Sequence, residues 1–392
     1  MSGDFSEQIK NLEEKGRLRS LNPLEQRQGC KVSYQGREFL NLTSNDYLGL
    51  AADRALLRQF YQGLDADGSA ESYALGCASS RLLSGDTPLA HELEQCLAES
   101  YDFPGCLLFN SGYHANIGIL PALCGKGDLV LSDKLNHASI HDGLKLTAAD
   151  HKRFNHGDME QLGWLLEKHR DQYDRVVIVS ESVFSMDGDV ADLGELVELK
   201  KQYRVMLYLD EAHGIGVHGQ RGLGLGEATG LLHEIDLFVA TFGKALGAAG
   251  AFVLCSREIR QYLINHCRSL IFSTILPPVV LNWNLFVFKQ MMEMTGQREH
   301  LAELAGKLRK ELVRCGLQTR GATNIVPVLL GEDRLAVQLA EQLRNEGYLI
   351  FPVRPPAVPE GSARFRLSLT ADMSWQDLAG LPTRIAELKQ AL

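Results

Sequence analysis

Two short stretches near the middle of the chain carry the side chains best suited to chemistry. The apolar run Val205–Leu209 ends on Asp210, and His213 follows three positions later. A second apolar run, Leu237–Ala240, leads into a glycine-rich turn that contains Lys244. Binding sites in open α/β sheets gather at the carboxyl ends of the strands. Both turns therefore lie where a site is expected.

Lys244 has two interpretations. A lysine in a turn is usually a surface residue whose aliphatic stem packs on apolar neighbours while its ammonium stays in water. Here small residues follow it from Ala245 to Gly250, and no carboxylate lies next to it in the sequence. A desolvated lysine has a lowered pKa and can attack carbonyl groups, as Schiff-base lysines do. The local sequence leaves both interpretations open.

Asp210 bears on which of the two interpretations of Lys244 is preferred. An aspartate after so apolar a strand needs a cationic partner, because an unpaired buried carboxylate is costly. A salt bridge or a helix N-cap would satisfy it. The functional alternative is a partner for the protonated ring nitrogen of pyridoxal phosphate, which makes that ring a strong electron sink. Lys244 follows 34 positions later (244 − 210) and one strand further on, as a cofactor held between the two side chains would require.

Two other motifs fit the same cofactor. The run Ser111–Asn116 follows a strand-like segment and opens a helical one. Small residues there let backbone N–H groups face a phosphate at the positive end of a helix dipole, although a plain turn would look the same. His137 is either an ordinary hydrogen-bonded histidine or one that stacks on a flat ring. His137 and His141 are spaced for a shared metal, but no third ligand accompanies them, so we expect no metal site.

These residues need a scaffold, and from about residue 86 the chain alternates helices with short apolar strands. Apolar runs without polar alternation favour a mainly parallel sheet with helices on both faces. We predict an N-terminal helix and short strands (1–45), a large α/β domain (46–277) and a smaller C-terminal α+β domain (278–392). Predicted strands lie at 106–109, 129–131, 176–180, 205–209, 237–240 and 251–254, then near 325–330, 349–353 and 365–369; long helices are predicted at 278–312 and 375–391.

Composition limits the classes of function. The 392 residues carry a formal charge of −9, which argues against a nucleic-acid partner bound by bulk electrostatics. Eight cysteines occur without a C-x-x-C pair, which favours reduced thiols in the cytoplasm. The first twenty residues have no apolar core, so we expect no signal peptide. The uncharged run 269–288 is long enough to span a bilayer, but two prolines and two asparagines in it argue against a membrane span.

Four motifs together resemble the α-oxoamine synthases, a family of fold-type-I pyridoxal-phosphate enzymes. The resemblance extends from about Arg19 to Thr370. It implies a large domain with a mainly parallel sheet covered by helices, a smaller C-terminal α+β domain, and acyltransferase activity. The four motifs are 44–49 (SNDYLG), 184–189 (FSMDGD), 210–214 (DEAHG) and 241–244 (TFGK).

The resemblance assigns cofactor roles to residues of this chain. Lys244 would carry pyridoxal 5′-phosphate (PLP) as a covalent Schiff base and later move the α-proton of the substrate. Asp210 would keep the ring nitrogen protonated, and His137 would stack on the ring beside the substrate. Phe272 and Ser273 would reach the phosphate region of a neighbouring subunit, which implies a homodimer with shared active sites. Further contacts are assigned to the phenolic oxygen (His213, Ser185) and to the phosphate or ring pocket (Gly112, Tyr113, Thr241).

The resemblance also assigns substrate roles. Arg366 would bind an amino-acid carboxylate with Asn45 nearby, and Arg19 would meet the acyl substrate. The run 354–359 (RPPAVP) is most similar to members that join L-alanine to pimeloyl-CoA, or to the pimeloyl-carrier protein, in biotin biosynthesis. That reaction is a decarboxylating condensation.

The sequence differs from its relatives at two places, and two alternative functions stay open. Relatives commonly have Gly-Gly-Ser within the segment 76–81, and threonine at Ala357; both positions bear on the acyl donor. One alternative is a relative that uses glycine or serine with another acyl-CoA, such as 2-amino-3-ketobutyrate CoA ligase. Another is a protein of this fold that has lost catalysis and serves as a binding scaffold.

Overall fold

The computed structural model describes residues 5–19, 21–67 and 70–392, without the side chains of 65–67. Residues 1–4 and 20 of the predicted N-terminal part therefore lie outside the description. The chain groups into two compact units, each with its own sheet structure. The small unit consists of the chain up to Asp53, Ser185–Asp189 and Glu299–Leu392; the large unit consists of Arg54–Phe184 and Val190–Arg298.

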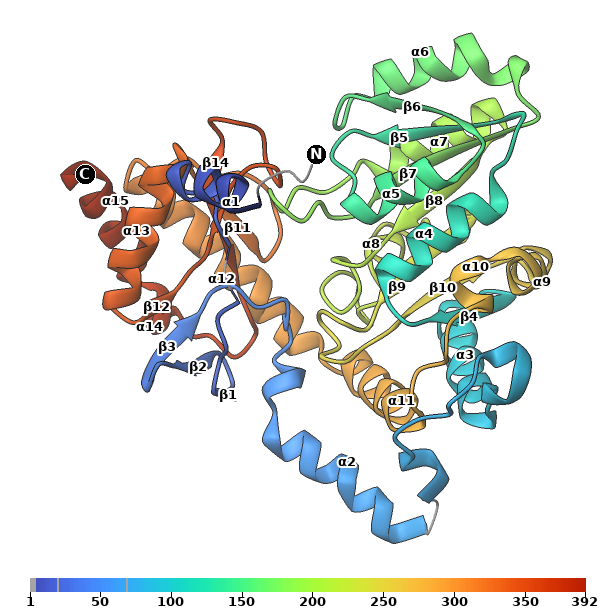
Figure 1. Ribbon diagram of the computed structural model, residues 1–392, viewed down its shortest axis with the longest axis horizontal. Helices are drawn as coiled ribbons and strands as arrows, with labels where there is room; N and C mark the ends of the chain where they lie inside the picture. The colour runs from blue at the N-terminus through green and yellow to red at the C-terminus, as the bar shows by residue number, and fades with distance from the viewer. Residues whose placement is uncertain (1–4, 20, 68–69) are drawn as a thin grey trace. The chain divides into compact units, whose positions relative to one another are not determined.

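A seven-stranded sheet forms the centre of the large unit (Figure 1). Its order is β4-β10-β9-β8-β7-β5-β6. The neighbours from β9 to β6 run parallel, whereas β10 is antiparallel to both of its neighbours. The predicted fold class is confirmed. The strands are β4 (Gly105–Phe109), β5 (Asp128–Asp133), β6 (Asp150–Phe154), β7 (Arg175–Glu181), β8 (Met206–Asp210), β9 (Leu237–Thr241) and β10 (Ala251–Cys255).

Helices cover both faces of this sheet, which is why its strands are apolar throughout. The helices of the large unit are α2 (Arg54–Asp67), α3 (Pro88–Tyr101), α4 (Gly112–Leu123), α5 (Ala138–Leu146), α6 (Met159–His169), α7 (Leu193–Tyr203), α8 (Leu225–Thr229), α9 (Arg257–His266), α10 (Arg268–Ile271) and α11 (Pro278–Met292), of which some pack on the sheet. On one face, Ile119 of α4 and Leu144 of α5 share a buried cluster with Val239. On the other, the ring of Tyr101 in α3 lies 5.0 Å from that of Phe238. Consecutive residues of β9 thus face opposite layers.

The edge strand β6 was missed by the sequence prediction. Its sequence is Asp-His-Lys-Arg-Phe, and only Phe154 is buried. It pairs with β5 alone, so most of its side chains remain in water. A strand of this kind lacks the apolar run on which the prediction relied.

The small unit holds two further sheets. Their orders are β1-β2-β3-β12 and β11-β14-β13. The predicted strand 349–353 is wrong as a single strand, because β12 pairs with β3 and β13 with β14. Pro352 begins β13 at the edge of its sheet, where a residue without an N–H is tolerated. The strands are β1 (Gln26–Gln28), β2 (Lys31–Tyr34), β3 (Arg37–Asn41), β11 (Ile325–Gly331), β12 (Tyr348–Leu349), β13 (Pro352–Val353) and β14 (Ala363–Ser368).

Both long predicted helices are interrupted. The first divides after Met292, and Gly296 weakens the start of the next helix. The second divides before Leu381, where Pro382 occupies the first turn of a new helix and cannot continue the preceding one. No helix in the described residues is long and apolar enough to cross a membrane. The remaining helices are α1 (Phe5–Glu14), α12 (Thr295–Arg314), α13 (Asp333–Asn345), α14 (Trp375–Leu378) and α15 (Leu381–Ala391).

The division into units differs from the predicted boundaries at 45/46 and 277/278, which remain predictions. The N-terminal segment groups with the C-terminal part, because β12 pairs with β3. Helix α11 groups with the large unit, because it packs against α3. Sequence order alone does not reveal either association.

Candidate active site

The carboxyl ends of β7, β8 and β9 bring several polar side chains together in the large unit. Glu181 at the end of β7 is paired in register with Asp210 at the end of β8, and Asp210 is paired with Val239 of β9. Thr241 ends β9, and Lys244 lies in the turn that follows. The two turns singled out in the sequence are therefore at one edge of one sheet.

Asp210 is buried, and both of its oxygens accept hydrogen bonds. Oδ1 accepts from the backbone of Ala212 at 2.9 Å, and Oδ2 accepts from Nδ2 of Asn116 at 2.9 Å. Asn116 in turn accepts from the hydroxyl of buried Tyr208 and donates to Ser139. The sequence prediction gave Asn116 no role. These bonds fix the direction of the Asp210 carboxylate.

Glu181 is a second buried carboxylate beside Asp210, and the sequence prediction missed it. Burial raises the pKa of Glu181 well above its usual value, and the charge of Asp210 raises it further, while Lys244 lowers it. Two neighbouring buried carboxylates resist simultaneous ionisation. The raised pKa of Glu181 favours its neutral form beside Asp210.

His137 precedes α5 and lies close to these groups. Its backbone N–H donates to the Glu181 carboxylate, and its Nδ1 lies 2.7 Å from the hydroxyl of Ser139. Desolvation lowers the pKa of His137, the Lys244 ammonium lowers it further, and Asp210 opposes both. The ring is exposed and neutral near pH 7, which suits a side chain that stacks on a flat ligand.

Lys244 is half-buried in a turn that its own backbone closes. The carbonyl of Lys244 accepts from the N–H of Gly247 at 2.9 Å, and the carbonyl of Phe242 accepts from Ala248 at 2.9 Å. The charge of Lys244 acts on both His137 and Glu181. The predicted lysine, imidazole and carboxylate are thus neighbours within one unit.

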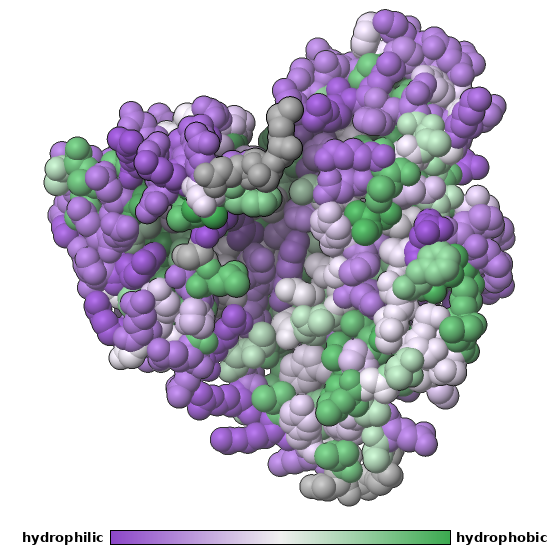
Figure 2. Space-filling model, viewed as in Figure 1, coloured by the Kyte–Doolittle hydropathy of each residue, from purple (hydrophilic) through white to green (hydrophobic). Residues whose placement is uncertain are grey.

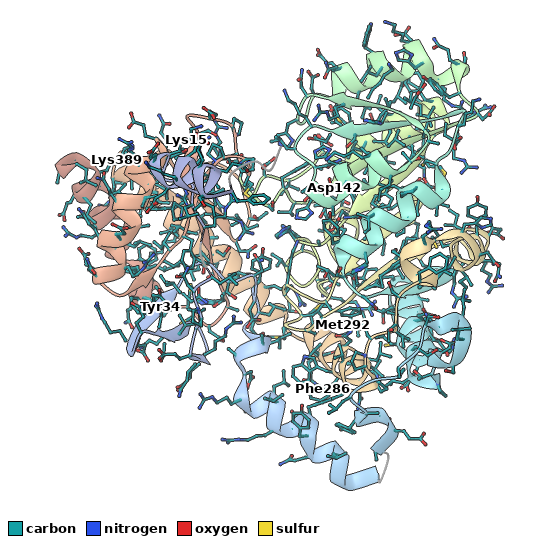
Figure 3. All side chains as sticks on the ribbon, in the orientation of Figure 1. Lys15, Tyr34, Asp142, Phe286, Met292 and Lys389 are labelled. Carbon is teal, nitrogen blue, oxygen red and sulfur yellow. The ribbon has the colours of Figure 1, made fainter. Side chains whose placement is uncertain are left out.

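The N-terminus of α4 lies beside the end of β9. Oγ of Ser111 caps the helix by accepting from the N–H of His114 at 3.1 Å. A Cβ on Gly112 would meet Cβ of Thr241 at 3.7 Å, so these backbones are close. Tyr113 is partly exposed, and its hydroxyl donates to Asp142 of α5 (labelled in Figure 3) at 2.7 Å. The first-turn N–H groups of α4 offer an anion site next to β9.

The turn after Asp210 contains two buried ionisable residues, Glu211 and His213. Oε1 of Glu211 accepts from the N–H of Gly226 at 2.9 Å. A Cβ on Gly214 would lie 1.8 Å from Oε2 of Glu211, and one on Gly224 would lie 2.8 Å from its carboxyl carbon. Glycine at both positions makes the space for this carboxyl, whose pKa burial raises to about 7. Nothing in the sequence distinguished Glu211 from a solvent-exposed acid.

Glu211→Gln should change how stability depends on pH. A carboxyl whose pKa is raised in the folded protein keeps a proton that the unfolded chain releases. The free energy of unfolding therefore falls as pH rises from about 4.5 to about 7, and this contribution is constant above that. The variant should lack this fall and gain about 3 kcal/mol over wild type across that range. Urea unfolding at a series of pH values measures it, with exposed Glu198→Gln as the control; identical profiles for wild type and Glu211→Gln would contradict the assignment.

Phe272 and Ser273 follow the short helix α10. Phe272 is 69% exposed, and the guanidinium of Arg268 lies 4.8 Å from its ring centroid. The adjacent Thr274 forms a β-bridge with Ser80. The predicted contact with a neighbouring subunit stays a prediction, and most of the Phe272 side chain is exposed in this chain.

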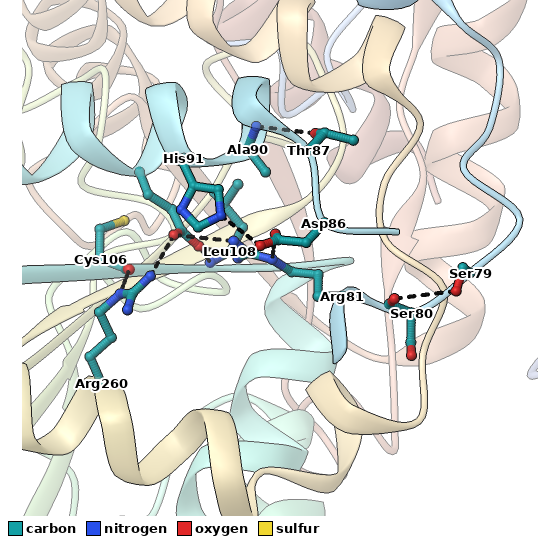
Figure 4. A network of polar contacts seen from close by, with 11 residues as sticks. Ser79, Ser80, Arg81, Asp86, Thr87, Ala90, His91, Cys106, Leu108 and Arg260 are labelled. Carbon is teal, nitrogen blue, oxygen red and sulfur yellow. Dashed lines mark hydrogen bonds and ion pairs between the residues drawn. The ribbon is translucent and has the colours of Figure 1, made fainter. Parts of the chain in front are cut away.

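The segment 76–81 is anchored by a buried ionic network (Figure 4). Arg81 bonds with Glu94 of α3 and, at 2.7 Å, with Asp86. Glu94 is 4% exposed and also accepts from Arg260 at 2.9 Å and from the N–H of Leu108 at 3.0 Å. Removing one member of such a network would leave an uncompensated buried charge. The segment that lacks the Gly-Gly-Ser of relatives is therefore held to α3 by the ion pair of Arg81 with Glu94. The sequence does not predict this ion pair.

The remaining predicted residues lie in the small unit. The guanidinium of Arg366 on β14 bonds to Asn45 and to Tyr47, both at 3.1 Å, and to the backbone carbonyl of Ser185. Nη1 also donates to Ser368 at 2.6 Å. The structure thus brings Arg366, Asn45 and Ser185 together. Half-buried and held by neutral acceptors, Arg366 is suited to bind a carboxylate.

Arg19 and Ala357 lie at the surface of the same unit. Both residues are exposed. The N–H of Ala357 donates to the carbonyl of Arg354 at 3.1 Å, which closes a turn in the proline-rich loop. Arg19 lines a cavity together with this loop. The two residues that the resemblance assigns to the acyl substrate therefore belong to neighbouring segments, and that assignment stays a prediction.

Comparison with known proteins decides the family. The family model for aminotransferase class I and II matches residues 37–385. The chain belongs to this family. It is 50% identical over 378 residues to the 8-amino-7-oxononanoate synthase of Chlorobaculum parvum, with 96% of each chain covered.

Solved structures of pyridoxal-phosphate enzymes are similar to this chain along most of its length. A variant of serine palmitoyltransferase from S. paucimobilis, with a bound PLP–myriocin aldimine, matches with a TM-score of 0.90 and 30% identity, over 99% of this chain and 97% of that one. The 8-amino-7-oxononanoate synthase of Francisella tularensis matches with a TM-score of 0.75 and 26% identity, over 90% and 98%. The predicted resemblance to the α-oxoamine synthases is confirmed.

Proposed function

We propose that the protein is a PLP-dependent acyltransferase that makes 8-amino-7-oxononanoate from L-alanine and pimeloyl-CoA, or the pimeloyl-carrier protein, in biotin biosynthesis. The observation that carries this proposal is the 50% identity, along 96% of the chain, to a relative named for that product. The side chains fit the cofactor. A buried carboxylate, a lysine, an exposed neutral imidazole and an open helix N-terminus lie at one sheet edge.

The large unit supplies the groups that act on the cofactor and on protons. Bound PLP supplies an electron sink that stabilises negative charge at the amino-acid α-carbon. Asp210 would pair with the ring nitrogen and keep it protonated. The N–H groups of Gly112 and Tyr113, with Thr241, would hold the phosphate. Lys244 would carry the cofactor; once the substrate amine has displaced it, its Nζ would take the α-proton of alanine and return a proton to that carbon at the end.

The small unit supplies the groups that position the substrates. Arg366 binds the alanine carboxylate, with Asn45 beside it. The alanine α-carbon then forms a bond to the thioester carbonyl carbon, and the thiolate leaves. The original alanine carboxylate departs as carbon dioxide, and its electron pair accepts the returned proton. Ser185 is proposed to contact the phenolic oxygen of the cofactor, as is His213 of the large unit.

We propose a homodimer in the cytoplasm. The large unit shows apolar side chains on its surface in Figure 2, and Leu75, Leu83 and Phe272 are 85%, 82% and 69% exposed. The segments of Leu83 and Phe272 are joined by the Ser80–Thr274 bridge. Exposed apolar side chains in neighbouring segments favour a protein interface. All eight cysteines are free thiols, as expected in a reducing compartment. Sedimentation velocity should give a dimer, and a monomer at micromolar concentration would contradict this.

The second candidate is a relative that uses glycine or serine with another acyl-CoA. It is favoured by Ala357 and by the departure at 76–81, which leave the acyl donor open. A panel of alanine, glycine and serine against pimeloyl-, acetyl- and palmitoyl-CoA, with product masses measured, separates the candidates. We expect product from alanine and pimeloyl-CoA at least about tenfold more efficiently than from any other pair; a different preferred pair would replace the proposed function. Absence of product from every pair, in protein that binds PLP, would favour a non-catalytic scaffold.

A further inference from the structure

The segment Ser185–Asp189 belongs to the small unit, although the residues on either side of it in the sequence belong to the large unit. Its backbone is bound at Gly188, whose carbonyl accepts from the N–H of Ala322 at 2.9 Å and from the hydroxyl of Thr323 at 3.1 Å. Gly188 has φ +66°, and a Cβ there would clash with the carbonyl oxygen of Ile325. Only glycine permits so close an approach. The segment is therefore packed directly against the backbone of the small unit.

A buried ion pair fixes the same segment to β14. The carboxylate of Asp187 accepts from Nη1 of Arg364, and the side chains of these two residues are 15% and 5% exposed. Nε of Arg364 donates to the carbonyl of Ser362 at 3.0 Å, which holds the guanidinium in place. Removing one partner of a buried ion pair leaves the other charge uncompensated. The position of Asp187 on β14 is therefore strongly determined.

The ion pair lies next to a second contact of the segment with β14. Arg364 and Arg366 are two residues apart on this strand, so their side chains leave the same face. Nε of Arg366 donates to the backbone carbonyl of Ser185, which is two residues from Asp187. The ion pair and this hydrogen bond are thus adjacent attachments of one short segment to one face of one strand.

The carbonyl of Ser185 bears on the direction of the Arg366 guanidinium. Nε carries one hydrogen in the plane of the guanidinium, so an acceptor for that hydrogen limits rotation of the plane. The other two nitrogens bond to Asn45 and Tyr47, both at 3.1 Å. A guanidinium binds a carboxylate well when its fork of donors is aligned with the carboxylate oxygens. Displacement of Ser185 would remove one of the acceptors that hold this alignment.

We propose that Asp187 is a positioning residue for the amino-acid carboxylate: its ion pair with Arg364 keeps the Ser185 carbonyl on Arg366. This rests on the proposed function, in which Arg366 binds the carboxylate of alanine, and it adds a residue that acts through Arg366. Asp187→Asn keeps the shape of the side chain and removes its charge, so the segment is held less tightly and the guanidinium is less well oriented. Loss of one well-aligned charge-assisted hydrogen bond changes affinity by about 10- to 100-fold.

The test compares L-alanine with L-alaninamide, which carries an uncharged amide in place of the carboxylate. Titration of the PLP-loaded protein, followed by the absorbance of the cofactor, gives both dissociation constants without a thioester. Asp187→Asn should weaken alanine binding by about tenfold or more and leave alaninamide binding unchanged. In turnover, KM for alanine should rise by a similar factor while kcat stays close to wild type, because the lost interaction is uniform binding.

Two further variants complete the design. Asp187→Asn combined with Arg364→Gln removes both charges, so no buried charge is left unpaired, and it should show the same selective loss of alanine binding. Glu38→Gln removes an exposed carboxylate that pairs with Lys31 at 2.7 Å in the same unit. It should bind both ligands as wild type does.

The outcomes separate this positioning role from the proposed function. Equal weakening of alanine and alaninamide binding in Asp187→Asn would overturn the role, because it would indicate a general structural defect. Unchanged alanine binding in both Asp187 variants would overturn it as well. Selective loss of alanine binding, in a protein that forms no product from alanine, would support the role and contradict the proposed reaction. Wild type that fails to bind alanine would contradict both.

Discussion

Lys244→Ala is expected to lower turnover by about 10⁴-fold or more, because this one side chain is proposed both to carry the cofactor and to move the α-proton. The visible absorbance of the purified protein should change at the same time, since the covalent link between lysine and cofactor is gone. Lys244→Arg should be similarly inactive. A guanidinium keeps the positive charge near His137 and Glu181 but cannot act as a base near neutral pH. Steady-state kinetics and an absorbance spectrum check both variants.

The matched control is Lys201→Ala. Lys201 is an exposed lysine of the same unit, paired with Glu234 at 2.7 Å on the surface. Its removal should leave turnover and absorbance unchanged. Lys244→Ala protein that turns over at the wild-type rate would exclude Lys244 as the cofactor lysine. If circular dichroism shows that Lys244→Ala does not fold, turnover of Lys244→Arg provides the test instead.

Asp210→Asn is expected to lower turnover by about 10²- to 10³-fold, comparable to the loss of one preorganised electrostatic group in other enzymes. The amide has nearly the same shape as the carboxylate but could not keep the ring nitrogen protonated in the proposed role, so the electron sink would weaken. One oxygen must also serve the two donors, Asn116 and Ala212, that now bond to separate oxygens. Steady-state kinetics and PLP affinity measure the effect.

A second measurement distinguishes chemistry from a structural defect. The charge of Asp210 raises the pKa of Glu181, so Asp210→Asn should lower that pKa, which infrared spectroscopy of the carboxyl band can follow. Exposed Asp171→Asn in the same unit should alter neither turnover nor this pKa. Wild-type turnover in Asp210→Asn would contradict the proposed role, and an unchanged Glu181 pKa would contradict the coupling of the two carboxylates.

Much of this candidate site followed from local sequence. Asp210 and Lys244 were predicted because each follows a buried strand, and parallel strands β8 and β9 place their ends side by side. The same rule applies to Glu181 after β7, but no sequence motif marks this residue. Asn116 and Glu94 gave no signal, because their roles depend on partners 94 and 14 positions away. The sequence offers no means of pairing such residues.

The family resemblance supplied residues that pattern analysis alone did not reach. Arg366 and Asn45 are 321 positions apart, and only their places in the motifs connected them before the structure joined them by a hydrogen bond. Their association depends on the N-terminal segment folding against the C-terminal sheet. The periodicity of apolar residues within a segment does not predict which distant segment it will pack against.

The sequence by itself determined the class of fold, the catalytic pair Asp210 and Lys244 as a hypothesis, and the cofactor they suit. These follow from short-range rules: apolar runs form buried strands, and the turns after them expose polar groups. The tertiary structure decided which residues share an environment. The buried carboxyl of Glu181 beside Asp210, the antiparallel direction of β10, and the contact of Arg260 with Glu94 all arise from packing between distant segments. Charge and burial are properties of neighbours in space, so a residue's chemistry is settled only when those neighbours are known.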